Sequence, residues 1–390
     1  MPRRSAVLRL KRDREARAHV HPWIFKGDVA DASPVEPGSV VTVLDAGGRF
    51  VGRGLFNPRP ALCCRIVTWQ DEPVDARLLG RRITAAIAAR GQTVPVVGRL
   101  VWSEADGLPG LVVDRYGPVL VVQCQTLGIR RMRDDLVVAL RARLGDLAVL
   151  GSDDPVVAGL EGFEPVSGWI GRPGPDEVIV DEDGVQIAVR PGSGHKTGVY
   201  LDQAANRVRV GAAAGAGDVL DVFAYTAGFA VHALRAGARR AVCVESSAEA
   251  IAGARRNLEL NGLSERAEIR AVNAFDELRR LDRERARFDL VVLDPPPFAR
   301  SRSALDAALR GYKEINLRAL RLLAPGGRLA TFSCSHHVDE GTFEATVREA
   351  ATDAGTRVRL LDHLPQSADH PVLLTVPETR YLQGLLLELA

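Results

Sequence analysis

Cysteine, lysine and aromatic residues are scarce in this chain of 390 residues, and it has no long apolar run. The five cysteines are odd in number and contain no C-x-x-C pair, so neither a disulfide framework nor a cysteine-based zinc site is expected. The apolar stretch over 136–150 is interrupted by Arg141, Arg143 and Asp146, which excludes a membrane helix of about 20 residues there. The N-terminus also lacks the apolar core of a secretory signal. We therefore expect a cytoplasmic protein that makes no membrane contact.

The chain also has little excess charge, with a formal net charge of +2, and its content of 46% hydrophobic and 26% charged residues is that of a globular protein. This composition excludes a disordered chain and provides for two or three domains. Among the 51 basic residues, four are lysine and 47 are arginine. Arginine matches the geometry of phosphate, but a general bias in composition would produce the same excess. Charge alone therefore does not identify an RNA-binding protein.

The first segment of the chain, residues 1–70, is rich in β-like patterns. Apolar runs over 40–44 and 50–56 flank a glycine-containing turn at 45–48, and another β-like run covers 61–67. Several short strands joined by Gly and Pro turns predict a small β-barrel.

The second segment, residues 71–186, mixes helical and strand-like periodicity. Apolar residues at helical spacing cover 78–87 and 129–144, and two β-like runs bracket a turn at 116–118. This mixture predicts an α+β domain.

The third segment, residues 187–390, alternates strand-like and helix-like patterns. Serial βα units predict an open, doubly wound parallel sheet of the Rossmann-like type, which binds ligands at the carboxyl ends of its strands. The helix over 312–323 is expected to stop at Pro325-Gly326-Gly327. The last two strands are expected to form an antiparallel edge. The expected strands cover 218–223, 240–244, 267–272, 288–293, 328–332, 358–361 and 384–387.

Polar residues at the ends of these strands predict a nucleoside-binding edge. The loop after the first strand has a single glycine in place of the G-x-G-x-x-G of NAD-binding proteins, so a pyrophosphate cofactor is disfavoured. Glu245 lies 24 residues after Asp221, near the offset of about 20 at which an acid reaches ribose hydroxyls. S-adenosylmethionine fits this pattern, and the alternative is a doubly wound domain without such a site. The candidate cofactor residues are Asp221, Tyr225, Thr226, Gly228, Glu245, Asn273, Ala274 and Asp294.

The fourth and fifth strands end in side chains that suit chemistry on a base. Asp294 is followed by three prolines at 295–297, which lack N–H donors and hold the backbone extended beside Phe298. This shape suits a flipped planar base, and a rigid loop that caps the sheet is the alternative. Cys334 follows the next strand, where a nucleophile is favoured over a small core residue. Its thiolate would need an electropositive setting, which His336 or His337 could supply.

Two other features look like known ligand-binding motifs but lack residues that those motifs require. Residues 192–197 are similar to a phosphate loop, yet His195 stands where that motif needs a glycine directly before Lys196. The pairs His336-His337 and His19-Val20-His21 lack metal-site partners at workable spacing, so no metal is expected.

Taken together, these motifs resemble the large-subunit rRNA methyltransferase I family, whose members make 5-methylcytosine in 23S rRNA. The resemblance covers nearly the whole chain. Ala227 departs from the family pattern, which usually has a second glycine there, and Pro297 stands where a polar residue is commoner. The similar stretches are 21–25, 195–203, 221–229, 293–298, 333–337 and 369–371.

The resemblance implies a PUA RNA-binding domain at 1–70, a central α+β domain at 71–186 and a class I methyltransferase domain at 187–390. It implies Cys334 as the nucleophile, Asp294 as the acid facing the base and S-adenosylmethionine as the cofactor. The partner would be 23S rRNA or a large-subunit assembly intermediate, and a homodimer is compatible with the sequence. The implied substrate-binding residues are Pro295, Pro296, Phe298 and Lys196.

Two other functions stay open at this point. An exocyclic-amine methyltransferase, acting on guanine N2 or adenine N6, would use the Asp294 loop and leave Cys334 inert. A non-catalytic RNA-binding assembly factor would rely on the arginine-rich first segment. The position of the new methyl group and turnover on deproteinised RNA distinguish the three.

Overall fold

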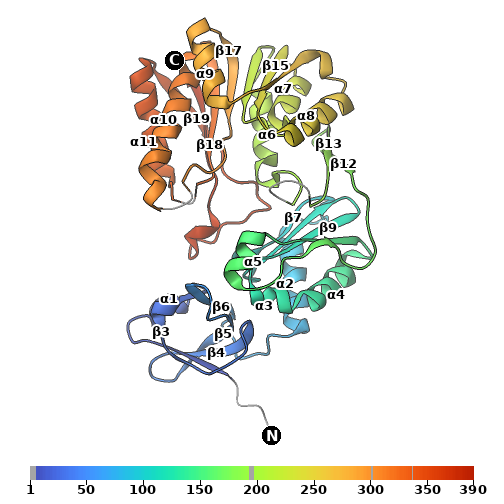
Figure 1. The fold of residues 1–390 in the computed structure, drawn as a ribbon, viewed down its shortest axis with the longest axis vertical. Helices are drawn as coiled ribbons and strands as arrows, with labels where there is room; N and C mark the ends of the chain where they lie inside the picture. The colour runs from blue at the N-terminus through green and yellow to red at the C-terminus, as the bar shows by residue number, and fades with distance from the viewer. Residues whose placement is uncertain (1–5, 193–196, 300–301, 336) are drawn as a thin grey trace. The chain divides into compact units, whose positions relative to one another are not determined.

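The structure is a computed structural model that describes residues 6–192, 197–299, 302–335 and 337–390 (Figure 1). The chain forms two compact units. Unit 1 contains the residues up to 178 with 189–199 and 368–379, and unit 2 contains 179–188, 200–367 and 380–390. The finer division at 70 and 186 stays a prediction.

The N-terminal part of unit 1 is a six-stranded sheet in the order β2-β6-β5-β4-β1-β3. Antiparallel β4 and β5 are joined by the expected turn, where Gly48 adopts a φ of +86°. Alternate residues of β4, Val41 and Val43, are buried in the core, which explains why this apolar run forms a strand. The strands are β1 (Val7–Leu10), β2 (Trp23–Phe25), β3 (Val29–Ala32), β4 (Ser39–Leu44), β5 (Phe50–Phe56) and β6 (Leu62–Thr68), with α1 (Glu15–Ala18).

The rest of unit 1 is a five-stranded sheet with helices, in the order β11-β10-β9-β8-β7. The helix expected over 129–144 is divided at Met132 into α3 (Leu127–Arg131) and α4 (Arg133–Leu144). The other helices are α2 (Ala76–Ala89) and α5 (Pro155–Glu161). The strands are β7 (Val97–Trp102), β8 (Leu111–Tyr116), β9 (Val119–Cys124), β10 (Ala148–Ser152) and β11 (Ser167–Trp169).

Unit 2 contains a seven-stranded sheet in the order β16-β15-β14-β17-β18-β20-β19. The first five strands are parallel, and β20 pairs antiparallel with both β18 and β19, so the expected parallel sheet and its antiparallel edge are confirmed. The strands are β14 (Asp218–Val222), β15 (Arg240–Glu245), β16 (Ala267–Ala271), β17 (Phe288–Leu293), β18 (Leu323–Ser333), β19 (Val358–His363) and β20 (Gln383–Leu389). A separate ribbon is formed by β12 (Val178–Glu182) and β13 (Val185–Val189).

Helices cover both faces of this sheet, α6 to α8 on one and α9 to α11 on the other (Figure 1). The core on the second face is formed by apolar residues of the strands and of α9, α10 and α11. The helices are α6 (Ala204–Ala212), α7 (Gly228–Arg235), α8 (Ala248–Leu260), α9 (Ala274–Glu284), α10 (Leu305–Arg321) and α11 (Glu340–Ala354). Among the described residues, no helix is both long enough and apolar enough to cross a membrane.

The Pro325-Gly326-Gly327 stretch does not act as the expected boundary between helix and strand. Helix α10 already ends at Arg321, and β18 begins at Leu323, before the proline. The register against β17 shifts between Phe288 and Leu290, which indicates a bulge, and Gly326 within it has a φ of +71°. The Pro-Gly-Gly stretch is therefore accommodated inside the strand.

Candidate active site

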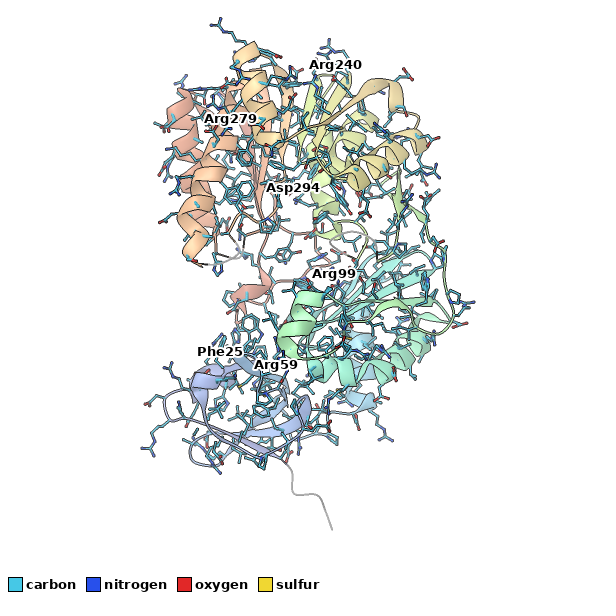
Figure 2. The ribbon with its side chains drawn as sticks, viewed as in Figure 1. Phe25, Arg59, Arg99, Arg240, Arg279 and Asp294 are labelled. Atoms are coloured by element: carbon cyan, nitrogen blue, oxygen red, sulfur yellow. The ribbon has the colours of Figure 1, made fainter. Side chains whose placement is uncertain are left out.

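The parallel strands of unit 2 bring four expected site residues to one edge of the sheet. Strand β14 pairs with β15 on one side and β17 on the other, and β17 pairs with β18. Because these strands run in the same direction, Asp221, Glu245, Asp294 and Cys334 all lie at their carboxyl ends. Figure 2 shows Asp294 at this end of the unit and Arg240 at the opposite end.

Asp221 is a buried carboxyl group with incomplete hydrogen bonding. Its Oδ2 accepts the backbone N–H of Ala230 at 3.1 Å, and its Oδ1 has no partner among the described residues. Burial, together with the nearby carboxylates of Asp294 and Glu245, raises the pKa of Asp221 to about 7. The sheet edge therefore holds a buried acid that is only partly ionised near neutral pH.

The loop after β14 has an unusual backbone. Phe223, Tyr225 and Ala227 have φ values of 63°, 48° and 59°, in the left-handed region that costs an L-residue about 1–2 kcal/mol each. The loop is held by a hydrogen bond from the Tyr225 N–H to Glu245 Oε2 at 2.9 Å. The Tyr225 ring packs edge-on against Tyr200 with centroids 5.1 Å apart. Strain of this kind at strand ends is typical of binding loops.

Glu245 and Asn273 both bond to backbone N–H groups at the strand ends. Glu245 Oε1 accepts the N–H groups of Ser246 and Ser247 at 2.7 and 2.8 Å. Asn273 is exposed, and its side chain caps α9 by accepting the N–H of Phe275 at 2.9 Å. The next residue, Ala274, is buried.

Thr226 and Gly228 have structural roles in the same loop. The carbonyl oxygen of Thr226 accepts the side-chain amide of Asn257 at 2.9 Å. Gly228 begins α7, and a Cβ there would lie 2.6 Å from Cδ of Arg207. The glycine is therefore needed for the close approach of the Arg207 side chain.

The loop after β17 places Asp294 beside aromatic rings. Pro295 is buried, whereas Pro296 is exposed. The Phe298 ring is partly buried and lies 4.7 Å from the ring of Tyr312, measured between centroids. Phe298 also contacts the rings of Phe223 and Phe275. Phe223 and Phe275 were not selected from the sequence as site residues, although Phe223 directly follows β14 and Phe275 lies in the first turn of α9, after β16.

Cys334 is the one cysteine of the five that is not buried. Its Sγ lies 3.8 Å from the carbonyl oxygen of Pro295, in the loop of Asp294. By contrast, burial raises the pKa of Cys63 to about 11 and that of Cys124 to about 12, which keeps these thiols protonated. Cys334 therefore combines accessibility with a position beside the Asp294 loop.

Two other expected contributors cannot be placed. Lys196, expected to bind substrate, and His336, a candidate partner for the Cys334 thiol, lie outside the described residues. The neighbouring His337 is exposed.

The sequence analysis did not find a largely buried cluster of charged side chains next to the loop after β14. Arg207 Nε and Nη2 both lie 2.6 Å from the Glu182 carboxylate, and His232 Nε2 lies 2.9 Å from Glu182 Oε1. Burial opposes the charge of Glu182, yet Arg207 and His232 hold its pKa well below the usual range. Arg207 Nη1 also donates to the carbonyl oxygen of Tyr200 at 2.9 Å, which fixes the backbone beside Tyr225.

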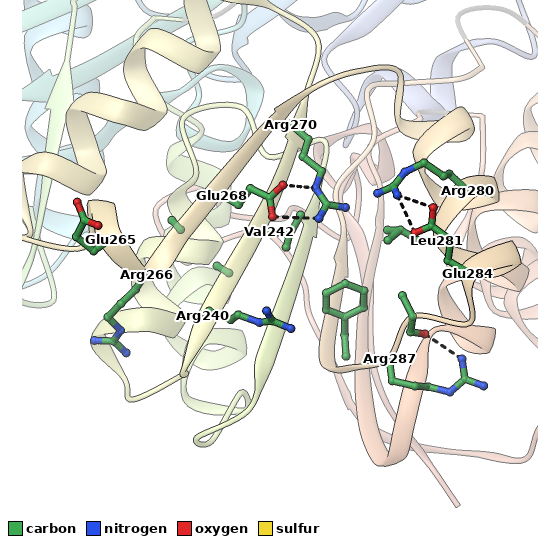
Figure 3. A pocket seen from close by; sticks show the side chains of 14 residues that line it. Arg240, Val242, Glu265, Arg266, Glu268, Arg270, Arg280, Leu281, Glu284 and Arg287 are labelled. Atoms are coloured by element: carbon green, nitrogen blue, oxygen red, sulfur yellow. Dashed lines mark hydrogen bonds and ion pairs between the residues drawn. The ribbon is translucent and has the colours of Figure 1, made fainter.

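A cavity of about 410 Å³ lies elsewhere in unit 2, where β15 and β17 begin (Figure 3). Among the charged side chains in its wall, Arg270 pairs with Glu268, and Arg280 pairs with Glu284. Because these charges are neutralised within the wall and the strands point away from it, this cavity is not the candidate active site.

The strand-end residues fit S-adenosylmethionine. This cofactor is a cation with ribose hydroxyls, and the edge offers the carboxylates of Asp221, Glu245 and Asp294. The buried Oδ1 of Asp221, which has no partner among the described residues, provides an acceptor for a cationic or N–H group.

Comparison with known proteins shows which class of enzyme this chain belongs to. Residues 164–372 match the S-adenosylmethionine-dependent methyltransferase family, and residues 8–69 match the PUA-like domain. A solved chain from Streptococcus mutans, described as a SAM-dependent methyltransferase, superposes with a TM-score of 0.85 at 18% identity, covering 98% of this chain and 99% of that one. A second solved methyltransferase, in complex with S-adenosylhomocysteine, superposes equally well. The chain is thus an S-adenosylmethionine-dependent methyltransferase with an N-terminal PUA-like domain.

Curated relatives narrow this class further. Proteins of Shewanella denitrificans and Shewanella frigidimarina, both named ribosomal RNA large subunit methyltransferase I, are 38% and 39% identical to the chain over 374 residues, which is 94% of the chain and 94% of each relative. The Erwinia tasmaniensis protein of the same name is 38% identical over 93% of the chain. The chain belongs to the ribosomal RNA large subunit methyltransferase I family, which confirms the resemblance seen in its motifs.

Proposed function

We propose that the protein methylates C5 of a cytosine in 23S rRNA through a covalent bond between Cys334 and C6 of the base. The observation that carries this proposal is the placement of the Cys334 thiol 3.8 Å from the Pro295 carbonyl oxygen, in the loop that begins with Asp294. The names of the curated relatives support large-subunit rRNA as the substrate. A substrate of this kind also places the protein in the cytoplasm.

The chemistry follows from the low nucleophilicity of C5. The Cys334 thiolate forms a bond to C6, which removes aromaticity and makes C5 an enamine carbon. Bound S-adenosylmethionine supplies an electrophilic methyl group. After C5 is methylated it loses its proton to solvent, the C6–S bond breaks, and the thiolate leaves as aromaticity is restored. Asp294 stabilises the adduct by hydrogen bonding to the Watson–Crick edge of the base.

The remaining strand-end residues form the cofactor subsite in this proposal. Glu245 binds the ribose hydroxyls, and Asn273 and Ala274 contact the adenine. The loop with Tyr225, Thr226 and Gly228 surrounds the methionine end, where Asp221 and Asp294 complement the positive charge.

The substrate base is held by the Asp294 loop in this proposal. Pro295, Pro296 and Phe298 line the base, and Lys196 contacts the RNA backbone. The PUA-like domain at 8–69 binds flanking RNA through phosphates and hydroxyls, so affinity should fall as salt rises. Naked 23S rRNA and a large-subunit assembly intermediate are both candidate substrates.

The alternative is methylation of an exocyclic amine of guanine or adenine. It is favoured by the Asp-Pro-Pro-Pro-Phe loop, in which the carboxylate and the Pro295 carbonyl oxygen would hold the amine. That carbonyl oxygen instead accepts the Cys334 thiol. Because this oxygen is occupied by the thiol, the contact favours methylation at C5. The C5 reaction also uses the thiol as its nucleophile, whereas the amine reaction does not need it.

The test incubates the protein and labelled S-adenosylmethionine with 23S rRNA from cells that lack the enzyme, and analyses the nucleosides. We expect label in 5-methylcytidine, no label with Cys334→Ala, and full activity with the control Cys63→Ala. RNA containing 5-fluorocytidine should trap a stable protein–RNA adduct, because fluorine replaces the proton that must leave. Label in a methylated guanosine or adenosine, or full activity of Cys334→Ala, would refute the covalent mechanism.

A further inference from the structure

A chain of buried amides lies behind Asp294. Asn206 Nδ2 donates to the carbonyl oxygen of Pro365 at 3.0 Å and to Gln203 Oε1 at 2.7 Å. Gln203 Nε2 donates in turn to Asp294 Oδ1 at 3.1 Å. Both amide side chains are 2% exposed, so water does not compete for these bonds.

The direction of each hydrogen bond is determined by the backbone at one end. A carbonyl oxygen can only accept, so Asn206 must turn its amide nitrogen toward Pro365. The same nitrogen faces Gln203, which must therefore present its oxygen to Asn206 and its nitrogen to Asp294. The chain of bonds ends on Asp294 Oδ1 as an acceptor, which disfavours a proton on this oxygen and favours the ionised carboxylate.

Other charged or titratable groups also act on Asp294. Arg207 on α6 is close enough to interact electrostatically and favours the ionised carboxylate, whereas Asp221 on β14 opposes it. Tyr200, which precedes the short turn at 201–203, interacts with both Asp294 and Cys334. The Gln203 amide donates to one defined oxygen of Asp294, Oδ1.

We propose that Gln203, oriented by Asn206, is a positioning residue that keeps Asp294 an ionised hydrogen-bond acceptor for an N–H group of the target base. This inference rests on the proposed function for the identity of the base. It assigns Asp294 the role of accepting from the amino group or a protonated ring nitrogen, because a hydrogen bond from the Gln203 amide favours the ionised carboxylate over the protonated acid.

The first experiment measures the charge of Asp294 directly. Protein with ¹³Cγ-labelled aspartate is titrated by NMR, and Asp294→Asn identifies the resonance. In Gln203→Leu, which is nearly isosteric, the midpoint of the Asp294 titration should rise by about one pH unit, because a donor to the charged form is lost. Gln203→Glu should raise it further. The matched control is Gln186→Leu, since Gln186 also donates its amide to an aspartate, Asp181, at 2.9 Å.

The second experiment follows methylation against pH with the same variants. In Gln203→Leu the acidic limb of kcat should move upward by the same amount as the Asp294 titration. Activity should therefore fall by up to about tenfold on that limb and recover above it, while the KM for RNA changes little. An unchanged Asp294 titration in Gln203→Leu would overturn the proposal. A shifted titration in a protein whose wild type methylates no RNA would support the role of Gln203 and refute the proposed function.

Discussion

Replacing Asp221 with asparagine should stabilise unit 2 while weakening cofactor binding. Asp221 is 1% exposed, lies near two other carboxylates, and has one oxygen without a partner among the described residues. Ionising such a group in the folded protein is unfavourable. Asparagine has the same shape, keeps an oxygen for the Ala230 N–H, and never ionises.

The size and pH range of the effect follow from the pKa of Asp221. Burial raises this pKa from the ordinary 3.8 to about 7, a difference of about 3 units or at most about 4 kcal/mol. At pH 4 and below the folded state is protonated and the unfolded state is only partly ionised, so the variant gains less than about 1 kcal/mol. As the pH rises toward 7 the unfolded state ionises first, so the wild type loses stability. At pH 8 we expect Asp221→Asn to be more stable by about 2–4 kcal/mol.

The assay can separate the two units because all four tryptophans, Trp23, Trp69, Trp102 and Trp169, lie in unit 1. Urea unfolding followed by far-UV circular dichroism reports both units, and tryptophan fluorescence reports unit 1. The circular dichroism midpoint of Asp221→Asn should rise at pH 8 and match the wild type at pH 4. The fluorescence midpoint should not move. Calorimetry should show about tenfold weaker binding of S-adenosylmethionine.

Asp218→Asn, at the other end of β14, is a control in which the change in stability should have the opposite sign. Hydrogen bonds from Arg239 and Arg240 lower the pKa of Asp218, so this carboxylate stabilises the fold above its unfolded pKa, and the contribution is lost as the pH falls. Asp218→Asn should therefore be less stable than the wild type at neutral pH. If Asp221→Asn were destabilised at pH 8 as well, the conclusion that the ionised Asp221 destabilises the folded protein would be wrong.

Three further substitutions test what stabilises unit 2: a largely buried ion pair, a helix C-cap and a close contact at a glycine. Arg207→Met should destabilise the fold by about 3–5 kcal/mol, because it leaves the largely buried carboxylate of Glu182 with His232 as its remaining charged partner among the described residues, and urea unfolding would measure this. Arg285→Gly should raise stability by about 1 kcal/mol, because the exposed Arg285 caps α9 at a φ of 56°, whereas the control Arg283→Gly inside that helix should lower it by a similar amount. Gly384→Ala should destabilise by about 2 kcal/mol or more, because a Cβ would lie 2.5 Å from the Phe332 ring.

The sheet edge was predictable from the sequence because it depends on local patterns. Strands β14, β15, β17 and β18 are largely apolar runs with a polar residue at or next to the carboxyl end, and parallel strands bring such ends together. Asp221, Glu245, Asp294 and Cys334 were therefore found from order along the chain alone. The division of the 129–144 helix at Met132 and the bulge at 324–327 were not found, because both depend on how the elements pack.

The groups behind the edge could not be predicted, because their partners are distant in sequence. Asn206 bonds to Pro365, which lies 159 positions away, and Gln203 bonds to Asp294, 91 positions away. No spacing rule connects such residues. A buried amide also looks like any other polar residue in a helical pattern, so its function becomes visible only with the contacts.

The carboxyl ends of the strands in unit 2 bring several acidic groups together, and this balance of charge bears on which ligand they bind. Asp221, Glu245 and Asp294 place three carboxyl groups near one another, and their mutual repulsion contributes to the raised pKa of Asp221. Arg207 interacts with Asp294, but its guanidinium group also binds Glu182 and the Tyr200 carbonyl oxygen. Among the residues that the structure describes, this edge therefore carries an excess of acidic groups. A cationic cofactor would reduce that excess and a neutral one would not. We therefore expect S-adenosylmethionine to bind more tightly than its thioether product and, at equal ligand concentration, to stabilise unit 2 more. Equal stabilisation by the two would show that the carboxylates do not sense the charge of the sulfonium.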